Sequence, residues 1–496
     1  KSSKSVLIFS SIGYATQTAI VDKTTDTIII AMAPASTDNA EVVVIGYGTQ
    51  RRSDVTGAIS KFKDEKLDEA PVSRLDQALQ GKIAGVQVQN ISSEAGADAK
   101  ITVRGISSIN AGANPLVVVD GQPIPDGLGT INMADVASVE VLKDAASAAI
   151  YGSRAANGVV LVTTVKGRKD SPAKISFDSY YGLQNIYKNL DPLNVQEYMY
   201  IMDEGRVNDG LAPTNWEAKI KNNSWLTNNY PGVAAEYGQE IWDKVQNGWE
   251  GTNWIDEMTN ADAPIQNYAL NITGGSEDIT YSMGVSYLDQ KGMIGGDITD
   301  AGYKRLTTRL NTQMVLKKND DHAIITVGEN FTYTNEENRS VATGNIYWND
   351  LHNALVQNPF MPAYWQQSID SNINEFGFSP TLEGISTGQT NPLAVMYYRH
   401  NYNTGKGNKI IGNVFLEVEP IKDLKFRSSY GIDSWFGHGR SMTPTYHLGT
   451  LYTNATNGAS QNQYFGANYT WTNTVSYKRQ FGDHEVDALI GTELLQ

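Results

Sequence analysis

Aromatic side chains are the groups in this chain best suited to chemistry on a ligand. The sequence holds 26 tyrosines and nine tryptophans, and its long connecting segments combine many of them with asparagine and glycine. An aromatic plane can stack on the CH face of a sugar ring, so these residues indicate carbohydrate contact. Packing of the segments against one another or against a covering protein is the alternative. The aromatic residues in question are Trp225, Trp242, Trp249, Trp254, Trp348, Tyr364 and Trp365, and we take Trp254, Trp348 and Trp365 as the ligand-binding candidates.

Patterns for catalysis or for a metal site are missing from the sequence. There is no cysteine, the six histidines are scattered, and no GxSxG, P-loop or HExxH motif occurs. No segment has the DxDxDG spacing of an EF-hand, and pairs such as Asp320-Asp321 are typical of charged turns. We therefore expect no enzyme activity, no cofactor and no bound metal.

Charge and hydropathy narrow the class of protein. The net charge of −15 argues against nucleic-acid binding. No run approaches the ~18 apolar residues that a membrane-spanning helix needs. Strands of a membrane barrel hide only alternate residues in lipid, so a barrel is compatible with this composition. A soluble, tyrosine-rich β-sandwich is the alternative.

From Lys174 onward the hydrophobic pattern has period two. Residues 279–288 alternate strictly over about the ~10 residues with which a tilted strand crosses a membrane. Nine such strands are predicted, near 173–189, 264–274, 278–289, 302–317, 321–335, 408–419, 422–435, 463–481 and 484–495. Tight turns alternate with long connections, notably 190–263 and 336–407. This alternation predicts a mainly β fold, a transmembrane antiparallel β-barrel whose long loops face outward.

Residues 50–167 predict a small α/β unit ahead of these strands, with turn and cap residues at its boundaries. The expected elements are strands at 86–89, 101–104, 116–119, 138–142 and 158–165, a helix from Ser73 and Asp76 through Gln80, and a helix at 145–150 capped by Asp144 and ended by Gly152. Before this unit, a polar linker leads into Glu41, Val42, Val43, Val44, Ile45, Gly46 and Tyr47. This β-branched run can add to the open edge of another sheet through its backbone, although an ordinary strand of the α/β unit is the alternative.

Four passages resemble TonB-dependent outer-membrane transporters of the SusC/RagA-like branch. They are Phe9 to Tyr14, Ile101 to Gly105, Val119 to Pro123, and Asp135 to Val165. The resemblance implies four parts: 1–33, the end of a carboxypeptidase-regulatory-like N-terminal extension; 34–49, a linker with the TonB box; 50–167, a plug domain inside the barrel; and 168–496, the N-terminal part of the barrel.

The resemblance also implies roles for particular residues. Glu41 to Tyr47 would couple the protein to TonB. The plug motifs are Arg104, Gly105, Asp120, Gly121, Tyr151, Gly152, Arg154 and Gly158. In related transporters the arginine that matches Arg104 lies in a buried polar network. We therefore expect Arg104 and Arg154 to hold the shape of the plug or its contact with the barrel.

The implied function is TonB-dependent import of oligosaccharides or peptides across the bacterial outer membrane. The implied partners are a SusD-like surface lipoprotein, TonB with the inner-membrane proton-motive complex, and outer-membrane lipid, in a dimer of SusC–SusD pairs without nucleic acid. Nine strands cannot close a bacterial barrel, so we expect about half of the ~22 strands of a plugged barrel here, with sequence missing before Lys1 and after Gln496. The alternatives are a non-transporting receptor or structural barrel, and a secreted glycan-binding sandwich.

Overall fold

The computed structural model describes residues 5–9, 17–21, 30, 42–45, 48–51, 59–63, 74–90, 92, 94–105, 112–124, 128–143, 149–187, 190–341, 349–385, 388–482 and 484–496. Glu41, Gly46, Tyr47 and Trp348 lie outside these ranges, as do the expected caps Ser73 and Asp144 and most of the expected helix at 145–150. In the part of the chain that is described, no helix is long and apolar enough to cross a lipid bilayer.

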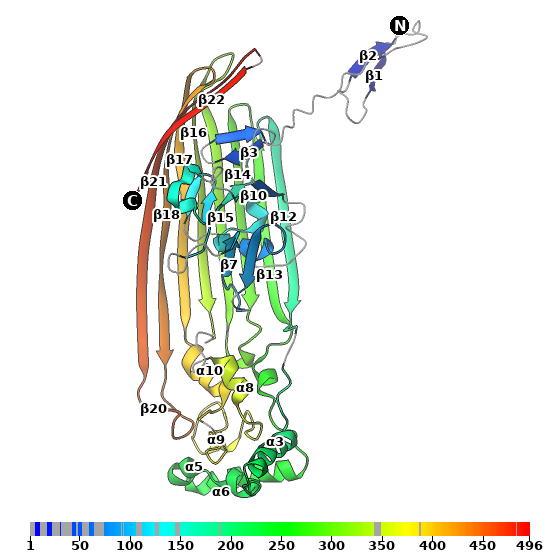
Figure 1. Cartoon of the computed structure of the whole chain (residues 1–496), viewed down its shortest axis with the longest axis vertical. Coiled ribbons are helices and arrows are strands. Elements are labelled where there is room, and N and C mark those ends of the chain that lie inside the picture. Colours follow the sequence, from blue (N-terminus) through cyan, green and yellow to red (C-terminus); the bar gives the residue numbers. More distant parts are fainter. Residues whose placement is uncertain are drawn as a thin grey trace.

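Nine long antiparallel strands form one curved sheet, which we call the wall (Figure 1). The strands are β12 (Ser171–Gln184), β13 (Ala263–Gly275), β14 (Ile279–Lys291), β15 (Gly302–Lys318), β16 (Ala323–Arg339), β17 (Thr404–Ile421), β18 (Leu424–Thr443), β21 (Gly458–Phe481) and β22 (His484–Leu495). They pair in chain order, and each corresponds to one predicted segment. The predicted fold class, a mainly β protein with a large antiparallel sheet, is confirmed.

The two faces of the wall have reversed polarity compared with a sheet in a soluble protein. On β14, Ser282 and Ser286 are buried, whereas Met283 and Val285, which point the other way, are each 49% exposed. Successive side chains of a strand point to opposite faces, so the buried inner face is polar and the exposed outer face is apolar. This arrangement suits a strand with lipid on its outer side.

A compact unit, which we call the plug, lies against the inner face of the wall (Figure 1). Its main sheet has the order β5-β10-β11-β8-β9, with β10 and β11 antiparallel and β11 and β8 parallel. The strands are β5 (Ile59–Lys63), β8 (Leu116–Val119), β9 (Gln122–Ile124), β10 (Val136–Leu142) and β11 (Val159–Thr164), and a separate hairpin joins β6 (Val86–Asn90) to β7 (Ala99–Val103). The valine-rich strands β8, β10 and β11 supply seven buried valines to the plug core, which is completed by α1, the β6–β7 hairpin and the turns around η3.

Short helical turns connect the plug strands. They are α1 (Leu75–Ala78), η3 (Leu128–Thr130), η4 (Met133–Asp135) and η5 (Ala149–Ala155). The helix predicted to run through Gln80 is therefore a single turn. The chain turns sharply soon after it, at Gly81 and Gly85, whose φ angles are 70° and 75°. Gly152 interrupts η5 with a φ of 61°, and its predicted role in ending a helix at 145–150 stays a prediction, because most of that helix lies outside the described residues.

The described parts of the long connections between residues 185 and 262, 340 and 403, and 444 and 457 fold together into a helical lobe at one end of the wall (Figure 1). Its helices are α3 (Val195–Asn208), α4 (Trp216–Lys221), α5 (Ser224–Asn229), α6 (Pro231–Gln246), α7 (Trp254–Met258), α8 (Asp350–Val356), α9 (Gln367–Asp370) and α10 (Pro392–His400). The sequence analysis did not predict these helices. Asparagine residues cap six of them, namely Asn194, Asn215, Asn223, Asn253, Asn349 and Asn391, so the asparagine content of the loops is in part a helix-start signal.

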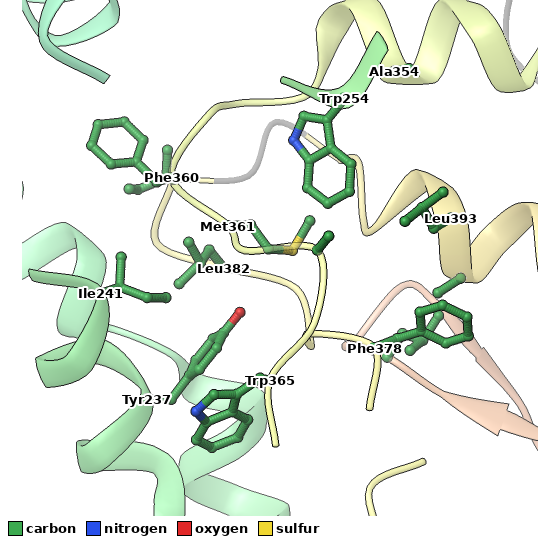
Figure 2. Packing of buried hydrophobic residues seen from close by; sticks show 14 of the residues in the cluster. Tyr237, Ile241, Trp254, Ala354, Phe360, Met361, Trp365, Phe378, Leu382 and Leu393 are labelled. Atoms are coloured by element: carbon green, nitrogen blue, oxygen red, sulfur yellow. The ribbon is translucent and has the colours of Figure 1, made fainter. Parts of the chain in front are cut away.

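The lobe has its own hydrophobic core, shown in Figure 2, where Tyr237 of α6 faces Trp365 and Leu382. Phe360 and Phe378 are fully buried within this core. Two buried ring donors reach backbone oxygens: the Tyr237 hydroxyl donates to Pro380 O at 2.8 Å and Trp254 Nε1 to Asn358 O at 3.0 Å. The long connections therefore form a folded layer over the space that the inner face of the wall borders, which we call the lumen.

Two short strand pairs precede the plug. β1 (Ser5–Phe9) pairs with β2 (Gln17–Val21), and β3 (Val42–Ile45) pairs with β4 (Gly48–Arg51), both antiparallel. In Figure 1, β3 lies near the end of the wall opposite the helical lobe, where tight turns join the strands.

Candidate functional site where the plug meets the wall

An ion pair between Asp135 and Arg309 fixes the plug to the middle of the wall. Asp135 ends η4, which Asn132 caps by accepting a hydrogen bond from Ala134 N, and Arg309 projects from β15. Arg309 Nε donates to Asp135 Oδ1 at 3.1 Å, and both side chains are almost fully buried. Arg309 also donates to Val165 O at 2.8 Å and to Asn271 Oδ1 at 3.3 Å, so one guanidinium ties the plug, the plug-to-wall junction and β13 together.

Further contacts follow the same strand toward the lobe. Arg305, also on β15, donates to Gly129 O in η3. The Thr334 hydroxyl of β16 donates to the neighbouring Thr130 O at 3.2 Å. Tyr303 packs against Gly96, where a Cβ atom would lie only 2.3 Å from its ring, so the wall approaches the plug backbone closely at this point. The inner-face residues of β15 thus contact the plug over at least three of its segments.

A ladder of asparagines crosses the inner face at the level of the β8–β9 turn. Asn311 donates to Asn330 on the next strand, and Asn330 Nδ2 donates to Asn413 Oδ1 at 3.1 Å. Asn413 Nδ2 then donates to Asp120 O in the plug at 3.4 Å. Three neighbouring wall strands are therefore linked to one plug turn by amide side chains.

The opposite side of the plug contacts β18, β21 and β22. Gln122 Nε2 donates to the Thr470 hydroxyl at 3.1 Å, and the Gln122 side chain occupies the space above Gly431. Arg154 forms an ion pair with Glu493 of β22. The plug is thereby attached to both sides of the curved wall.

The interface between plug and wall is predominantly polar. Ser282, Ser286 and Thr307 even have buried hydroxyls without a hydrogen-bond partner among the described atoms. Each net hydrogen bond stabilises the assembly by only about 1 kcal/mol, because water can replace it. An apolar interface of the same extent would resist separation through the hydrophobic effect. The interface between plug and wall can therefore hold the plug in place, and water can hydrate its polar groups when the plug moves.

The plug motifs expected from the sequence take several different positions. Asp120 and Gly121 form the β8–β9 turn with φ angles of 46° and 86°, and Asp120 Oδ2 accepts from the Thr164 hydroxyl at 2.5 Å. Tyr151 is buried against Leu142 and Val159. Gly158, with a φ of 88°, lies against Val103. These residues shape the plug backbone, whereas the side chain of Arg154 forms the ion pair with Glu493 of the wall.

Arg104 requires a correction. Its side chain is exposed rather than part of a buried polar network, and its backbone has a φ of 57° beside Gly105 at 94°. Arg104 N donates to Gly85 O at 3.1 Å and closes the β6–β7 hairpin. At Arg104 it is the backbone conformation, and not the guanidinium, that contributes to the structure of the plug.

The ligand candidates in the loops lie in the lobe core. Trp254 is 1% exposed and Trp365 is 4% exposed, and Trp365 Nε1 donates to Glu240 Oε2 at 2.9 Å. In this structure the two rings pack the lobe together, which was the alternative interpretation of their sequence pattern. They offer no stacking face to a sugar in this conformation.

Sequence reasoning missed the wall residues that hold the plug, among them Arg305, Arg309 and Asn413. A usable signal was present. Two arginines spaced four residues apart on the polar face of β15 would face lipid or lumen in mid-membrane, and a charged group there requires a polar partner.

Comparison with known proteins identifies relatives of the whole chain. Residues 51–159 match the family model of the TonB-dependent Receptor Plug Domain. TonB-dependent receptor P26 of Formosa agariphila is 32% identical over 489 residues, which is 98% of this chain and 44% of that protein. TonB-dependent receptor SusC of Bacteroides thetaiotaomicron is 27% identical over 480 residues, 91% of this chain and 42% of that protein.

Among solved structures, the RagAB peptide importer in its open-open state is similar, with a TM-score of 0.71 and 26% sequence identity. The match covers 92% of this chain and 49% of that one. The chain therefore spans less than half the length of each of these relatives.

Proposed function

Because the chain belongs to the SusC/RagA-like TonB-dependent receptors, we propose that it takes part in active nutrient import across the bacterial outer membrane. The protein is located in that membrane. The observation that carries the proposal is the plug held by hydrogen bonds and ion pairs against the polar inner face of a wall whose outer face is apolar. A pore blocked by a hydratable plug can be opened without removing the plug from a hydrophobic core.

The coupling step is assigned to β3. TonB would bind Glu41 to Tyr47 by adding a strand to β3, because backbone hydrogen bonds at a strand edge need no special side chains. The position of β3 at the short-turn end of the wall, away from the lobe, supports this assignment, since long loops of such proteins face outward. The division at residues 33, 49 and 167 into extension, TonB box, plug and barrel remains part of the proposal.

The partner and cargo are proposed from the relatives. A SusD-like surface lipoprotein would cover the lobe end, and two such pairs would form a dimer. The cargo is an oligosaccharide or a peptide. The similar RagAB importer carries peptides, but at 26% identity this similarity does not select the cargo of this chain.

Deletion of residues 41–48 tests the proposal. We expect uptake of labelled oligosaccharides or peptides to be abolished in cells while surface binding is retained, because the lobe and wall are unchanged. Deletion of the linker residues 35–39 is the control and should leave uptake largely intact. Uptake that persists without residues 41–48 would contradict the assignment of the TonB box.

A further inference from the structure

Two similar tripeptides face each other on neighbouring wall strands. Trp435-Phe436-Gly437 lies on β18 and Tyr464-Phe465-Gly466 on β21. The strands are antiparallel, and their register pairs Trp435 with Gly466, Phe436 with Phe465, and Gly437 with Tyr464. Each aromatic ring is thus opposite a glycine.

Each ring lies across the glycine that it faces. A Cβ atom built on Gly466 would lie 2.3 Å from the ring of Trp435, and one built on Gly437 would lie 2.5 Å from the hydroxyl of Tyr464. Despite these contacts Trp435 is 36% exposed and Tyr464 is 44% exposed. We call this pair of rings and its two glycines the aromatic shelf.

The aromatic shelf is on the inner face of the wall. Trp435 is two and four residues beyond Asp433 and Gly431, so the three residues share a face, and Gly431 lies against Gln122 of the plug. β18 runs from a tight turn at its start to the lobe connection after Thr443. The shelf therefore lies between the plug contacts and the helical lobe, facing the lumen. Phe436 and Phe465 point to the outer face, where they are 38% and 75% exposed.

Glycines lie next to the shelf on the neighbouring strand. On β17 and β18, Gly407 pairs with Gly437 and Gly405 pairs with Gly439, so two glycine pairs adjoin the two rings. Glycine in a strand loses more conformational entropy than other residues and contributes no packing. Tyr464 covers Gly437, its hydroxyl also lies 3.2 Å from a Cβ atom built on Gly407, and Asn462 lies over Gly439. Because these positions have no side chains of their own, the wall beside the two rings is low enough for a ligand to approach them.

Polar groups border the shelf on the same face. Lys409 pairs with Trp435 in register, and Lys409 Nζ lies 3.6 Å from Asp433 Oδ1. Asn462 contacts Gly439, and Glu336 pairs with Gly407 on the next strand. Amide, carboxylate and ammonium groups thus lie beside the two aromatic rings on the same face of the wall.

From this arrangement we propose that the aromatic shelf is a carbohydrate-binding subsite on the lumen wall, in which Trp435 and Tyr464 stack on sugar rings and Glu336 and Lys409 bind their hydroxyls. Sugar rings have apolar CH faces and polar edges, which match apolar planes with a polar border. The inference rests on the proposed import function, and it assigns to oligosaccharides a place that passing cargo would meet after the lobe and before the plug.

Site-directed labelling tests the inference on otherwise native protein. Because the chain has no cysteine, Asn462→Cys introduces a single thiol beside the shelf. Its rate of reaction with a maleimide is measured in outer-membrane preparations, without ligand, with a mixture of linear hexasaccharides (α-glucan, β-glucan and xylan), and with a mixture of unrelated nonapeptides. We expect oligosaccharides to slow labelling severalfold and peptides to leave it unchanged. Protection by peptides alone, or by neither mixture, would overturn the assignment to carbohydrate.

Paired leucine variants test the rings themselves. Trp435→Leu with Tyr464→Leu keeps both glycines covered but removes the aromatic planes, and Phe436→Leu with Phe465→Leu makes the matched change on the outer face. We expect affinity for the protecting hexasaccharide to fall by about tenfold in the inner variant and to stay unchanged in the outer one. Equal affinity in both variants would contradict the inference. If the inner variant does not assemble, protection of the Asn462→Cys thiol by oligosaccharides is the measurement that supports or contradicts the inference.

The two proposals fail in different ways. Protection at Asn462→Cys without TonB-dependent uptake would retain the subsite and contradict the import function. Uptake that occurs while no oligosaccharide protects this thiol would retain import and contradict the subsite.

Discussion

Asp135 of the plug and Arg309 of β15, which are 174 residues apart in sequence, form a buried ion pair with an Nε to Oδ1 distance of 3.1 Å. The same guanidinium donates to the backbone of Val165, where the plug leads into the wall. A buried pair of this kind fixes position strongly, because removing either partner leaves an uncompensated charge.

We predict that Asp135→Asn loosens the plug. Loss of one partner of a buried pair typically costs about 3–5 kcal/mol, and here that cost falls on the plug-bound state. The measurement is ion conductance and antibiotic sensitivity of cells, both of which should rise. Asp300→Asn, which removes the exposed partner of Arg339, is the control and should cost at most about 1 kcal/mol with no leak. A tight, impermeable Asp135→Asn protein would contradict the anchoring role.

The hairpin of β3 and β4 predicts a redox-dependent block of coupling. Val44 and Thr49 are register partners, and this chain has no cysteine, so Val44→Cys with Thr49→Cys allows one disulfide between β3 and β4. We expect uptake to fall sharply in oxidising medium and to return with a reductant, because TonB needs access to an edge of β3 and freedom to draw the strand away from β4.

The control for this disulfide is the other N-terminal strand pair. Leu7→Cys with Ala19→Cys joins β1 to β2 across an equivalent register pair and should not affect uptake. If oxidation of the Val44–Thr49 pair leaves uptake unchanged, β3 is not the strand that TonB draws out.

Trp254→Ala should unfold the helical lobe while leaving the wall intact. Trp254 is 1% exposed and donates to Asn358 O, so truncation leaves a large cavity and an unpaired carbonyl, with a cost of roughly 3–5 kcal/mol. Limited proteolysis should cut the lobe helices of the variant, and the heat-stable electrophoretic mobility of the barrel should not change. Trp471→Ala, on the exposed outer face of β21, is the comparison and should not sensitise the lobe. If the lobe of the Trp254→Ala variant resists protease, Trp254 is not needed for packing the lobe, and its role in ligand binding must be considered again.

Stability of the lobe should depend on Glu383 at acid pH. Burial opposes ionisation of this carboxylate, but hydrogen bonds from Ser224, Thr450 and Trp225 N outweigh it and lower the pKa of Glu383 below its usual 4.5. A lowered folded-state pKa stabilises the fold above the unfolded-state pKa, and the benefit is lost as pH falls through the lower value.

Hydrogen exchange of the lobe amides measures this dependence. Exchange should quicken as pH drops below about 4.5 in the native protein, after correction for the intrinsic rate. Glu383→Gln should weaken the lobe at neutral pH and flatten the profile. Glu236→Gln on the exposed side of α6 should reproduce the native profile. If the exchange rate of the Glu383→Gln variant still rises steeply as pH falls, groups other than Glu383 determine the pH dependence of lobe stability.

The sequence by itself determined the wall and its turns. Alternation in β14 and its neighbours is a local property, because polar lumen and apolar lipid impose period two on each strand separately. The Asp120-Gly121 turn could be predicted for a similar reason, because few residue types tolerate the positive φ angles that this turn requires. No distant contact is needed to set either feature.

Only the tertiary structure decided what each polar or aromatic side chain does. Arg309 bonds to Asp135, which is 174 residues away in sequence, and Asn413 bonds to Asp120, which is 293 residues away. No local sequence pattern encodes either contact. Trp254 and Trp435 have the same side chain, yet the lobe buries one completely while the wall leaves the other facing the lumen. Burial depends on which segments meet in space, and that is a property of the assembled fold.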